Sequence, residues 1–365
     1  MMQFDLDSRL SRYRDFFASR QSGKLLIITN PYPLASMRAV EKPPFCHWPL
    51  RLTDFDFSSD KDNRRFLNIH IENMERSLRN WWRSIPDDYI PAINAGGSYG
   101  VAVHYAFVTD QPLIFQEDTS YLNPVILEWD DLDRLRLDEY NFWFKRQVEA
   151  TAYLRQACEG LCFVEVVSVG PLDLSNALRG DQLFLDLYDA PDKVHELQDF
   201  STQALIWLDE AKQKAAGDVC GGRAIWGTWV PGNTDFTSSD ASDMCSSADH
   251  REFERPYLKR IADHFGGLFL HHHSLGRHMH AELAKLPNLH VLEINTDPSE
   301  PEPIHQIEAI YEEVAGTPLM IRCSAQDVFR YIDVLRTGQA IIAASVNSRE
   351  EARVVIDLVR RNSRI

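Results

Sequence analysis

The sequence predicts an α/β protein that folds as a closed (β/α)8 TIM barrel with an N-terminal helical extension. Three observations lead to this prediction: the chain length, a repeated order of short apolar runs and amphipathic segments, and helix-end signals between the runs. The chain has 365 residues, which suits one barrel plus an extension. The apolar runs are too short for buried helices and do not alternate cleanly between apolar and polar residues, as expected for parallel strands covered on both faces.

Seven apolar runs predict strands of this barrel. Four follow one another in the C-terminal half, at residues 267–273, 290–294, 318–323 and 340–344. Three more lie upstream, at residues 88–93, 161–167 and 223–229. The eighth strand has two candidates, residues 24–29 and 113–116, and the pattern leaves both open. Enough strand–helix units for closure favour a barrel over an open sheet.

Helices are predicted between these strands. Ser324 can cap one helix, with Asp327 in its first turn. Long helices are expected over residues 136–158 and 191–215, the second starting at a proline, which is a favoured first-turn residue. Each predicted helix thus has a strand on either side, which is the arrangement that right-handed crossovers need.

The chain is expected to divide into two parts without a low-complexity linker between them. Residues 1–85 are predicted to form the extension, and it packs on the barrel formed by residues 86–365. A core of this size needs no disulfide or metal to fold.

The composition limits the partners and the cell compartment. The net charge of −16 argues against a nucleic-acid partner, because phosphate binding needs clustered Lys and Arg. No stretch approaches the ~20 apolar residues of a membrane helix, and the N-terminus shows no basic region followed by an apolar run, so no signal peptide is expected. The cysteines form no CxxC pair and predict reduced thiols in a cytoplasmic protein. They are Cys46, Cys158, Cys162, Cys220, Cys245 and Cys323.

Three consecutive histidines end one predicted strand. Side chains alternate along a strand, so His271 and His273 share one face. If this face is the barrel interior, both imidazoles point to the mouth where barrel enzymes place their sites. Two imidazoles two residues apart can bind zinc, given a third ligand. Cys323, at the end of another predicted strand, is the first candidate for that ligand, and Glu293 is the second.

A long polar loop follows the predicted strand 223–229. Trp229 leads into this loop and is expected to bind substrate. Asp240 is predicted as a catalytic proton donor or polar anchor, together with His271 and His273. Asp243 is expected to bind substrate, although the alternative for both acids is that they only cap turns.

Other predicted strand ends supply further candidates for substrate binding. Arg179 follows a Gly-Pro turn, and Arg322 ends a strand, so either could hold a substrate carboxylate. Tyr99 lies in a glycine-rich loop whose backbone could approach a ligand. An anionic ligand in a chain of net charge −16 needs a local cluster of cationic side chains. The candidates for this cluster are Arg179, Arg223, Arg277 and Arg322.

The segments 170–180 and 185–195, the order of Asp240 and residues 253–261, and the strand ending at His271 resemble the uroporphyrinogen decarboxylase superfamily. The resemblance covers roughly residues 85–365. It implies a (β/α)8 barrel and places the chain beside porphyrinogen decarboxylases and zinc-dependent methylcobamide:coenzyme M methyltransferases.

The chain departs from both groups in its functional motifs. The decarboxylases carry an N-terminal Arg-Pro-Pro segment and a Met-Arg-Gln-Ala-Gly-Arg segment, where this chain has only Met37-Arg38-Ala39 and Pro43-Pro44, out of pattern. The methyltransferases carry His-x-Cys where this chain has His271-x-His273, and a late cysteine where it has a residue near Ser345. A zinc site would then use His271 and His273 with Cys323 or another replacement.

Three functional hypotheses stay open at this level. The first is a methyltransferase-like enzyme with zinc, linked to a corrinoid as substrate or partner protein, that moves a methyl group to or from a small acceptor. The second is a decarboxylase, or lyase, of a carboxylated, tetrapyrrole-like substrate, with Arg179 or Arg322 on the carboxylate and Asp240 handling the proton. The third is a non-catalytic binder of a cobamide or another small ligand. All three imply a small-molecule ligand, and the oligomeric state, including a homodimer, stays open.

Overall fold

The computed structural model describes residues 5–30 and 51–365. Met37–Ala39, Pro43-Pro44 and Cys46 lie outside the described residues. Helices are α1 (Leu6–Phe17), α2 (Asp60–Ser77), α3 (Val103–Ala106), α4 (Phe142–Ala157), α5 (Pro171–Arg179), α6 (Gln182–Asp189), α7 (Pro191–Ala216), α8 (Ser247–Phe253), α9 (Arg255–Phe265), α10 (His280–Leu283), α11 (Ile307–Val314), α12 (Ala325–Leu335) and α13 (Arg349–Asn362). Strands are β1 (Lys24–Asn30), β2 (Ala92–Asn94), β3 (Ile114–Phe115), β4 (Ser120–Tyr121), β5 (Phe163–Glu165), β6 (Gly222–Ile225), β7 (Thr228–Pro231), β8 (Asp235–Ser238), β9 (Leu268–His273), β10 (Leu289–Asn295), β11 (Leu319–Ser324) and β12 (Gln339–Ser345).

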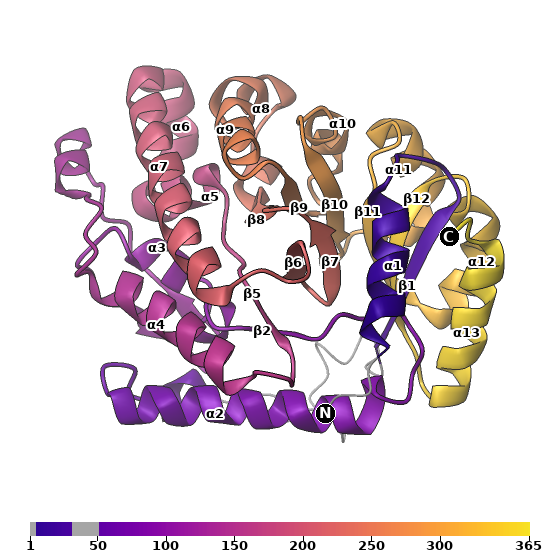
Figure 1. Ribbon diagram of the computed structural model, residues 1–365. Helices are drawn as coiled ribbons and strands as arrows, with labels where there is room; N and C mark the ends of the chain where they lie inside the picture. Colours follow the sequence, from indigo (N-terminus) through magenta and orange to yellow (C-terminus); the bar gives the residue numbers. More distant parts are fainter. Residues whose placement is uncertain (1–4, 31–50) are drawn as a thin grey trace.

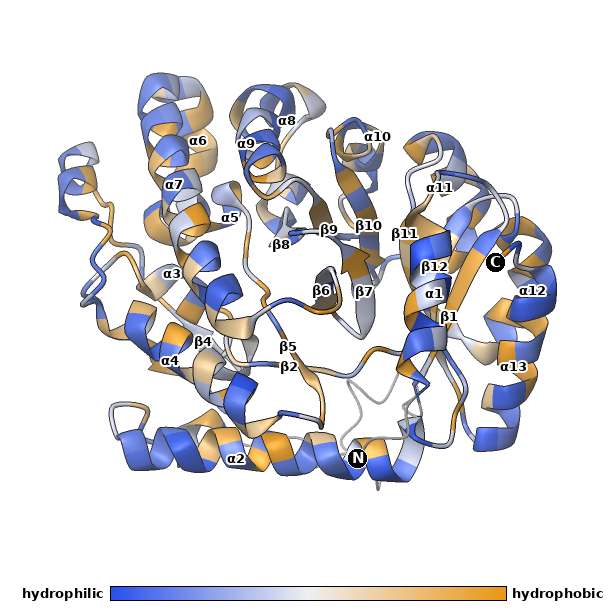
Figure 2. Ribbon diagram, viewed as in Figure 1, coloured by the Kyte–Doolittle hydropathy of each residue, from blue (hydrophilic) through white to orange (hydrophobic). Residues whose placement is uncertain are grey.

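The parallel strands form a TIM barrel surrounded by helices (Figure 1), which confirms the predicted fold class. Six strands are hydrogen-bonded in the order β1-β12-β11-β10-β9-β8, and β2 pairs with β5. The ladder aligns Ser238 of β8 and Glu293 of β10 with His271 of β9. In Figure 2 the helices carry hydrophilic and hydrophobic residues in alternation along their length, as expected for helices with one buried face.

Hydrogen bonds from backbone and side chains join the two sets of parallel strands. On one side, the amide of Asp88 donates to the Ile27 carbonyl at 2.8 Å, and its carboxylate accepts from the Ile27 amide at 2.9 Å. Asp87 accepts from the Thr29 amide at 2.9 Å. On the other side, the Thr237 hydroxyl donates to the Val169 carbonyl at 2.9 Å. These bonds satisfy backbone groups that the strand ladders leave unpaired.

The eighth strand is β1, one of the two candidates that the sequence left open. It pairs with β12 along its whole length, from Lys24 beside Gln339 to Asn30 beside Ser345. The other candidate forms β3, which pairs antiparallel with β4 outside the barrel sheet. Because β1 precedes residue 85, part of the predicted extension belongs to the barrel itself.

The prediction of a barrel strand at residues 223–229 is wrong. These residues form the antiparallel hairpin β6–β7, and the barrel strand is the following segment, β8. Trp226 and Gly227 occupy the turn with φ of 46° and 76°, as a two-residue hairpin loop requires. Trp226 packs against Phe236 and Phe269, whose ring centroids lie 4.7 and 6.1 Å away. The tip of the hairpin therefore supplies an aromatic side chain to the barrel interior.

Alternate residues of each strand belong to different packing layers. Phe269 of β9 and Met320 of β11 belong to one hydrophobic cluster, which also contains Phe236 of β8 and Ile341 of β12. Ile321 and Cys323 belong to a second cluster, between the strands and the helices, with Val328 of α12. In the part of the chain that the structure describes, no helix is long and apolar enough to cross a membrane.

Candidate metal centre

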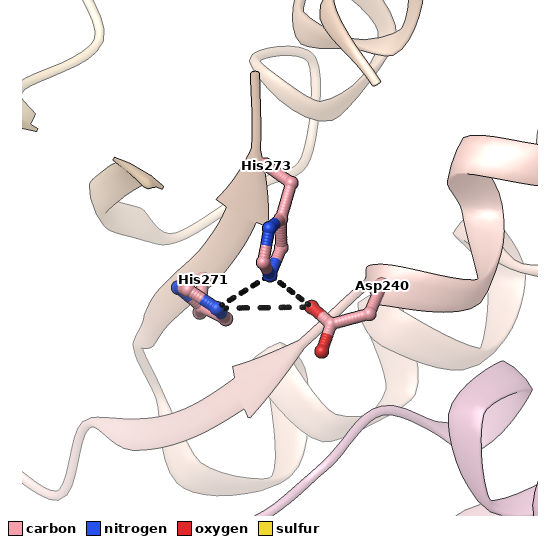
Figure 3. Close-up of side chains that lie close together, drawn as sticks. All are labelled: Asp240, His271 and His273. Atoms are coloured by element: carbon pink, nitrogen blue, oxygen red, sulfur yellow. Dashed lines mark hydrogen bonds and ion pairs between the residues drawn. The ribbon is translucent and has the colours of Figure 1, made fainter. Parts of the chain in front are cut away.

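Three potential metal ligands converge at the C-terminal end of the barrel strands. The Nε2 atoms of His271 and His273 lie 3.1 Å apart. The Asp240 carboxylate, at the start of a short 3-10 helix (Asp240–Met244) that follows β8, lies 3.8 Å from His271 Nε2 and 3.7 Å from His273 Nε2. Figure 3 shows the three side chains pointing toward a common centre.

The period of the β-strand places the two histidines together. His271 and His273 are two residues apart on β9 and follow Phe269, which points into the barrel interior. His272 lies between them and is fully buried, with its ring nitrogens 3.1 Å from the carbonyl oxygens of Ser239 and Gly276. The prediction that His271 and His273 share a face is therefore confirmed by the geometry.

The spacing of the three ligand atoms fits a metal ion. The circle through atoms 3.1, 3.7 and 3.8 Å apart has a radius of about 2.1 Å, which equals the usual Zn–N distance. Asp240 is half exposed, with 50% of its side-chain surface accessible, so the centre opens to solvent. Three protein ligands and an open position are the arrangement of catalytic rather than structural zinc sites.

Carboxylates fix the orientation of both imidazoles. His271 Nδ1 is hydrogen-bonded to Glu293 of β10, whose second oxygen accepts from Arg322 Nε at 2.8 Å. His273 Nδ1 lies 2.7 Å from Asp297, which also accepts from the Leu275 amide at 2.8 Å. A carboxylate on Nδ1 holds the proton there and leaves the Nε2 lone pair for a metal, as in the carboxylate–histidine–zinc triads of known sites.

The two Nε2 atoms consequently face each other as acceptors. With both protons held at Nδ1, the lone pairs of His271 and His273 point at each other and repel. A cation at their centre removes this repulsion. The triad therefore has the donor set, the tautomers and the spacing of a cation site.

The surrounding charge also favours a cation. Partial burial of its carboxyl group, followed by the charges of Asp173, Asp243, Glu293 and Glu254, raises the pKa of Asp240. Burial likewise raises the pKa of Asp243 to about 6. A dication near these groups stabilises their ionised forms.

Among the predicted substrate-binding residues, Arg322 and Asp243 lie near this centre. Arg322 is connected to His271 through Glu293, and its guanidinium lies 5.2 Å from the centroid of a Trp226 ring. An oxygen of Asp243 lies 3.5 Å from Nε2 of His272, next to the two candidate ligands.

The structure holds the other three predicted binding residues in packing contacts. Tyr99 is fully buried and donates to Asn63 at 2.7 Å. Arg179 forms a buried ion pair with Asp186 at 2.7 Å. Trp229 is buried in β7 and donates to the Val219 carbonyl at 2.7 Å. None of the hydrogen bonds or ion pairs found among residues 5–30 and 51–365 joins these three to the metal centre.

Cys323 does not fit the third-ligand position for which it was predicted. Its side chain is fully buried in the layer between strands and helices, because odd-numbered residues of β11 face outward. Burial raises the pKa of its thiol, which disfavours the thiolate that a metal needs. Asp240 occupies the third-ligand position instead. Glu293, the second candidate, is hydrogen-bonded to Nδ1 of His271, on the side of the ring that faces away from the centre.

Two residues at the centre were not predicted from the sequence. Asp297 follows the end of β10 by two residues and pairs with His273, a position at which barrel enzymes carry functional groups. Trp226 packs against the His271 ring, with centroids 5.0 Å apart, but the sequence placed it inside a strand. A Trp-Gly pair between two short apolar runs could have indicated the turn.

The fold resembles that of a solved methyltransferase from Methanosarcina mazei. The TM-score is 0.57 at 12% sequence identity, over 98% of this chain and 99% of that chain. Homocysteine methyltransferase MmuM from Escherichia coli, in its metallated form, gives a TM-score of 0.37 at 10% identity, over 96% and 99% of the two chains. The second score is too low to support an argument, and the first shows a shared fold.

No protein-family model and no curated protein sequence matches this chain. The fold implied by the resemblance to the uroporphyrinogen decarboxylase superfamily is thus supported by a structure rather than by sequence relatives.

Proposed function

We propose that this chain is a metal-dependent enzyme of the methyltransferase type, in which Asp240, His271 and His273 hold a zinc ion. The observation that carries the proposal is the convergence of two Nε2 atoms and a carboxylate, with both Nδ1 atoms committed to carboxylates. The fold shared with a methyltransferase is consistent with this chemistry. The substrate we propose is a small acceptor, with a corrinoid-bound methyl group as donor.

The residues around the triad have separate roles in this proposal. A zinc ion held here would supply the Lewis acidity that lowers the pKa of an acceptor thiol and makes it nucleophilic. Glu293 and Asp297 hold the imidazole protons away from the centre. Arg322, which is partly exposed, and Asp243 bind polar groups of the acceptor. Trp226 shields the inner side of His271 from water.

The contacts of the predicted cationic residues do not favour the decarboxylase hypothesis. Arg179, its first candidate for the carboxylate, is committed to Asp186 and to the carbonyl oxygens of Ile126 and Leu127. Arg223 and Arg277, which were expected to join a cationic cluster, bond to the Gly217 carbonyl and to Glu313 instead. Of the four predicted arginines, all of which the structure describes, Arg322 alone is connected to the centre, whereas a substrate with several carboxylates calls for several cationic partners.

Elemental analysis and a methyl-transfer assay test the proposal. Protein purified with zinc supplementation should hold one zinc per chain, and His271→Ala should hold none. The zinc-loaded protein should then consume methylcobalamin in the presence of a thiol from a panel of small acceptors, which is visible as a change in the corrinoid absorption spectrum. Absence of zinc from the wild type would refute the metal site. Zinc without turnover on any acceptor would favour the non-catalytic binder.

A further inference from the structure

Of the three candidate ligands, Asp240 is the one that lies outside a strand. His271 and His273 are fixed by the ladder of β9 with β10, whereas Asp240 begins a short helical turn after β8. Its side chain is half exposed, so packing on the carboxylate itself does not hold it in place. The backbone on either side of Asp240 therefore sets the position of its Cα atom and limits where the carboxylate can reach.

On the C-terminal side, a buried carboxylate holds this backbone. Asp173 Oδ1 accepts from the Ala241 amide at 2.7 Å. Its Oδ2 accepts from the Gly170 amide at 3.0 Å and from the Ser238 hydroxyl. Asp173 thus caps the N-terminus of α5 with one oxygen and fixes the residue after Asp240 with the other.

On the N-terminal side, a second buried carboxylate acts through a serine. The Ser239 hydroxyl donates to Glu254 Oε1 at 2.6 Å, and Glu254 Oε2 lies 2.6 Å from His250 Nδ1. Ser239, His250 and Glu254 are all fully buried. Burying a carboxylate is unfavourable unless its oxygens are paired, so loss of the Ser239 hydroxyl from Glu254 would leave a buried oxygen without its donor.

We propose that Asp173 and Glu254 are positioning residues that hold the loop of the third ligand from both sides, and so set the affinity of the centre for a divalent cation. The inference rests on the proposed metal site and goes beyond it, because neither residue points at the cation. The loop is preorganised in this way: a ligand whose backbone is already fixed loses little conformational freedom when a cation binds.

The experiment measures cation affinity in variants that each remove one of the hydrogen bonds holding the loop of Asp240. Ser239→Ala removes the link to Glu254, and Asp173→Ala removes the acceptor of the Ala241 amide. Glu254→Gln keeps an oxygen that accepts from Ser239, so it separates hydrogen bonding from charge. Zinc affinity is measured by competition with a chromogenic chelator, and the absorption bands of bound Co²⁺ report the geometry of the ligands.

Two control variants match these changes elsewhere in the fold. Ser201→Ala removes a buried serine hydroxyl of α7 that bonds to Ser175 at 2.9 Å. Asp131→Ala removes a carboxylate that accepts from the Leu127 and Glu128 amides at 3.0 Å and caps a short 3-10 helix (Trp129–Arg134). The melting temperature of every variant is measured with a chelator present, which separates loss of stability from loss of affinity.

We expect Ser239→Ala and Asp173→Ala to weaken zinc binding by about 10–100-fold, as for other residues that orient metal ligands. They should also shift the Co²⁺ bands, whereas Glu254→Gln and both controls should bind within about threefold of the wild type. Affinity and spectra in Ser239→Ala and Asp173→Ala equal to those of the controls would overturn the inference while leaving the proposed metal site intact. Normal metal binding without methyl transfer would overturn the proposed function and leave the inference intact. A wild type that binds no divalent cation would overturn both.

Discussion

Replacing Glu293 by glutamine should weaken cation binding although Glu293 is not expected to touch the cation. Glu293 is fully buried and accepts from two donors, His271 Nδ1 and Arg322 Nε. Glutamine has one oxygen for these two donors. The guanidinium of Arg322 always carries its proton, so it retains the oxygen, and the amide NH₂ faces His271 Nδ1. Because the amide donates a hydrogen bond to Nδ1, the proton of His271 moves to Nε2, the atom that must bind the cation.

The magnitude follows from this change of tautomer. A residue that orients a metal ligand is typically worth 10–100-fold in metal affinity, which corresponds to about 1.4–2.8 kcal/mol. The upper half of this range is expected here, because the pair Glu293–His271 is buried and involves a charged acceptor.

Two measurements check this prediction for Glu293→Gln. Competition with a chelator gives the zinc affinity, and long-range ¹H–¹⁵N correlation spectra of the metal-free protein give the tautomer of His271. Glu210→Gln is the matched control, since Glu210 pairs with His264 at 2.8 Å on the surface. If Glu293→Gln binds zinc as tightly as Glu210→Gln, or if His271 keeps its proton at Nδ1, the proposed role of the carboxylate is refuted.

Three further predictions concern residues outside the ligand set. Cys323→Ala should keep the wild-type zinc content, because the thiol faces the helices, and should lower the free energy of unfolding by about 1 kcal/mol. Loss of zinc, measured by elemental analysis, would contradict the assignment of Asp240 as third ligand. Arg179→Ala should lower the free energy of unfolding by about 3–5 kcal/mol, because it leaves Asp186 buried without its partner, and should leave zinc affinity unchanged. Denaturation midpoints and zinc affinity measure the two effects. Unchanged stability would argue against a structural role for Arg179. His104 is buried, and burial, followed by the charge of Lys212, holds its pKa well below 6.5, so folding should become less favourable as the pH falls below 6.5, by at most about 1.4 kcal/mol per pH unit. Urea unfolding at several pH values measures how the free energy of unfolding depends on pH. This dependence should be shallower in His104→Gln than in the wild type or in the surface control His264→Gln. Equal slopes in the three proteins would contradict the role of His104.

Local sequence patterns were sufficient to predict the strands of the C-terminal half and the shared face of His271 and His273. Strand periodicity is a property of the chain itself: residues two apart lie on one face whatever the strand packs against. The cap of α12 by Ser324 and Asp327 was also visible, because its residues are three apart in sequence. In these cases the interacting groups are close in the chain.

Prediction from the sequence failed where a local pattern was compatible with two different structures. Residues 223–229 are apolar enough for a buried strand, but a turn at Trp226 and Gly227 folds them into a hairpin. Cys323 ends a strand as predicted, yet the register of β11 turns its side chain away from the barrel interior. A shift of one residue in a strand moves a side chain to the opposite face, and the sequence alone did not establish that register.

The sequence was enough to predict the fold class, because strand–helix units repeat along the chain, and the pair of imidazoles, because residues two apart on one strand share a face. Tertiary structure decided the third ligand and the groups behind the imidazoles. Asp240 is 31 residues before His271, and Glu293 and Asp297 come from the next strand and its loop. Only the parallel alignment of β8, β9 and β10 brings these groups together, since the strand ladder sets which residues lie side by side across segments that are distant in sequence.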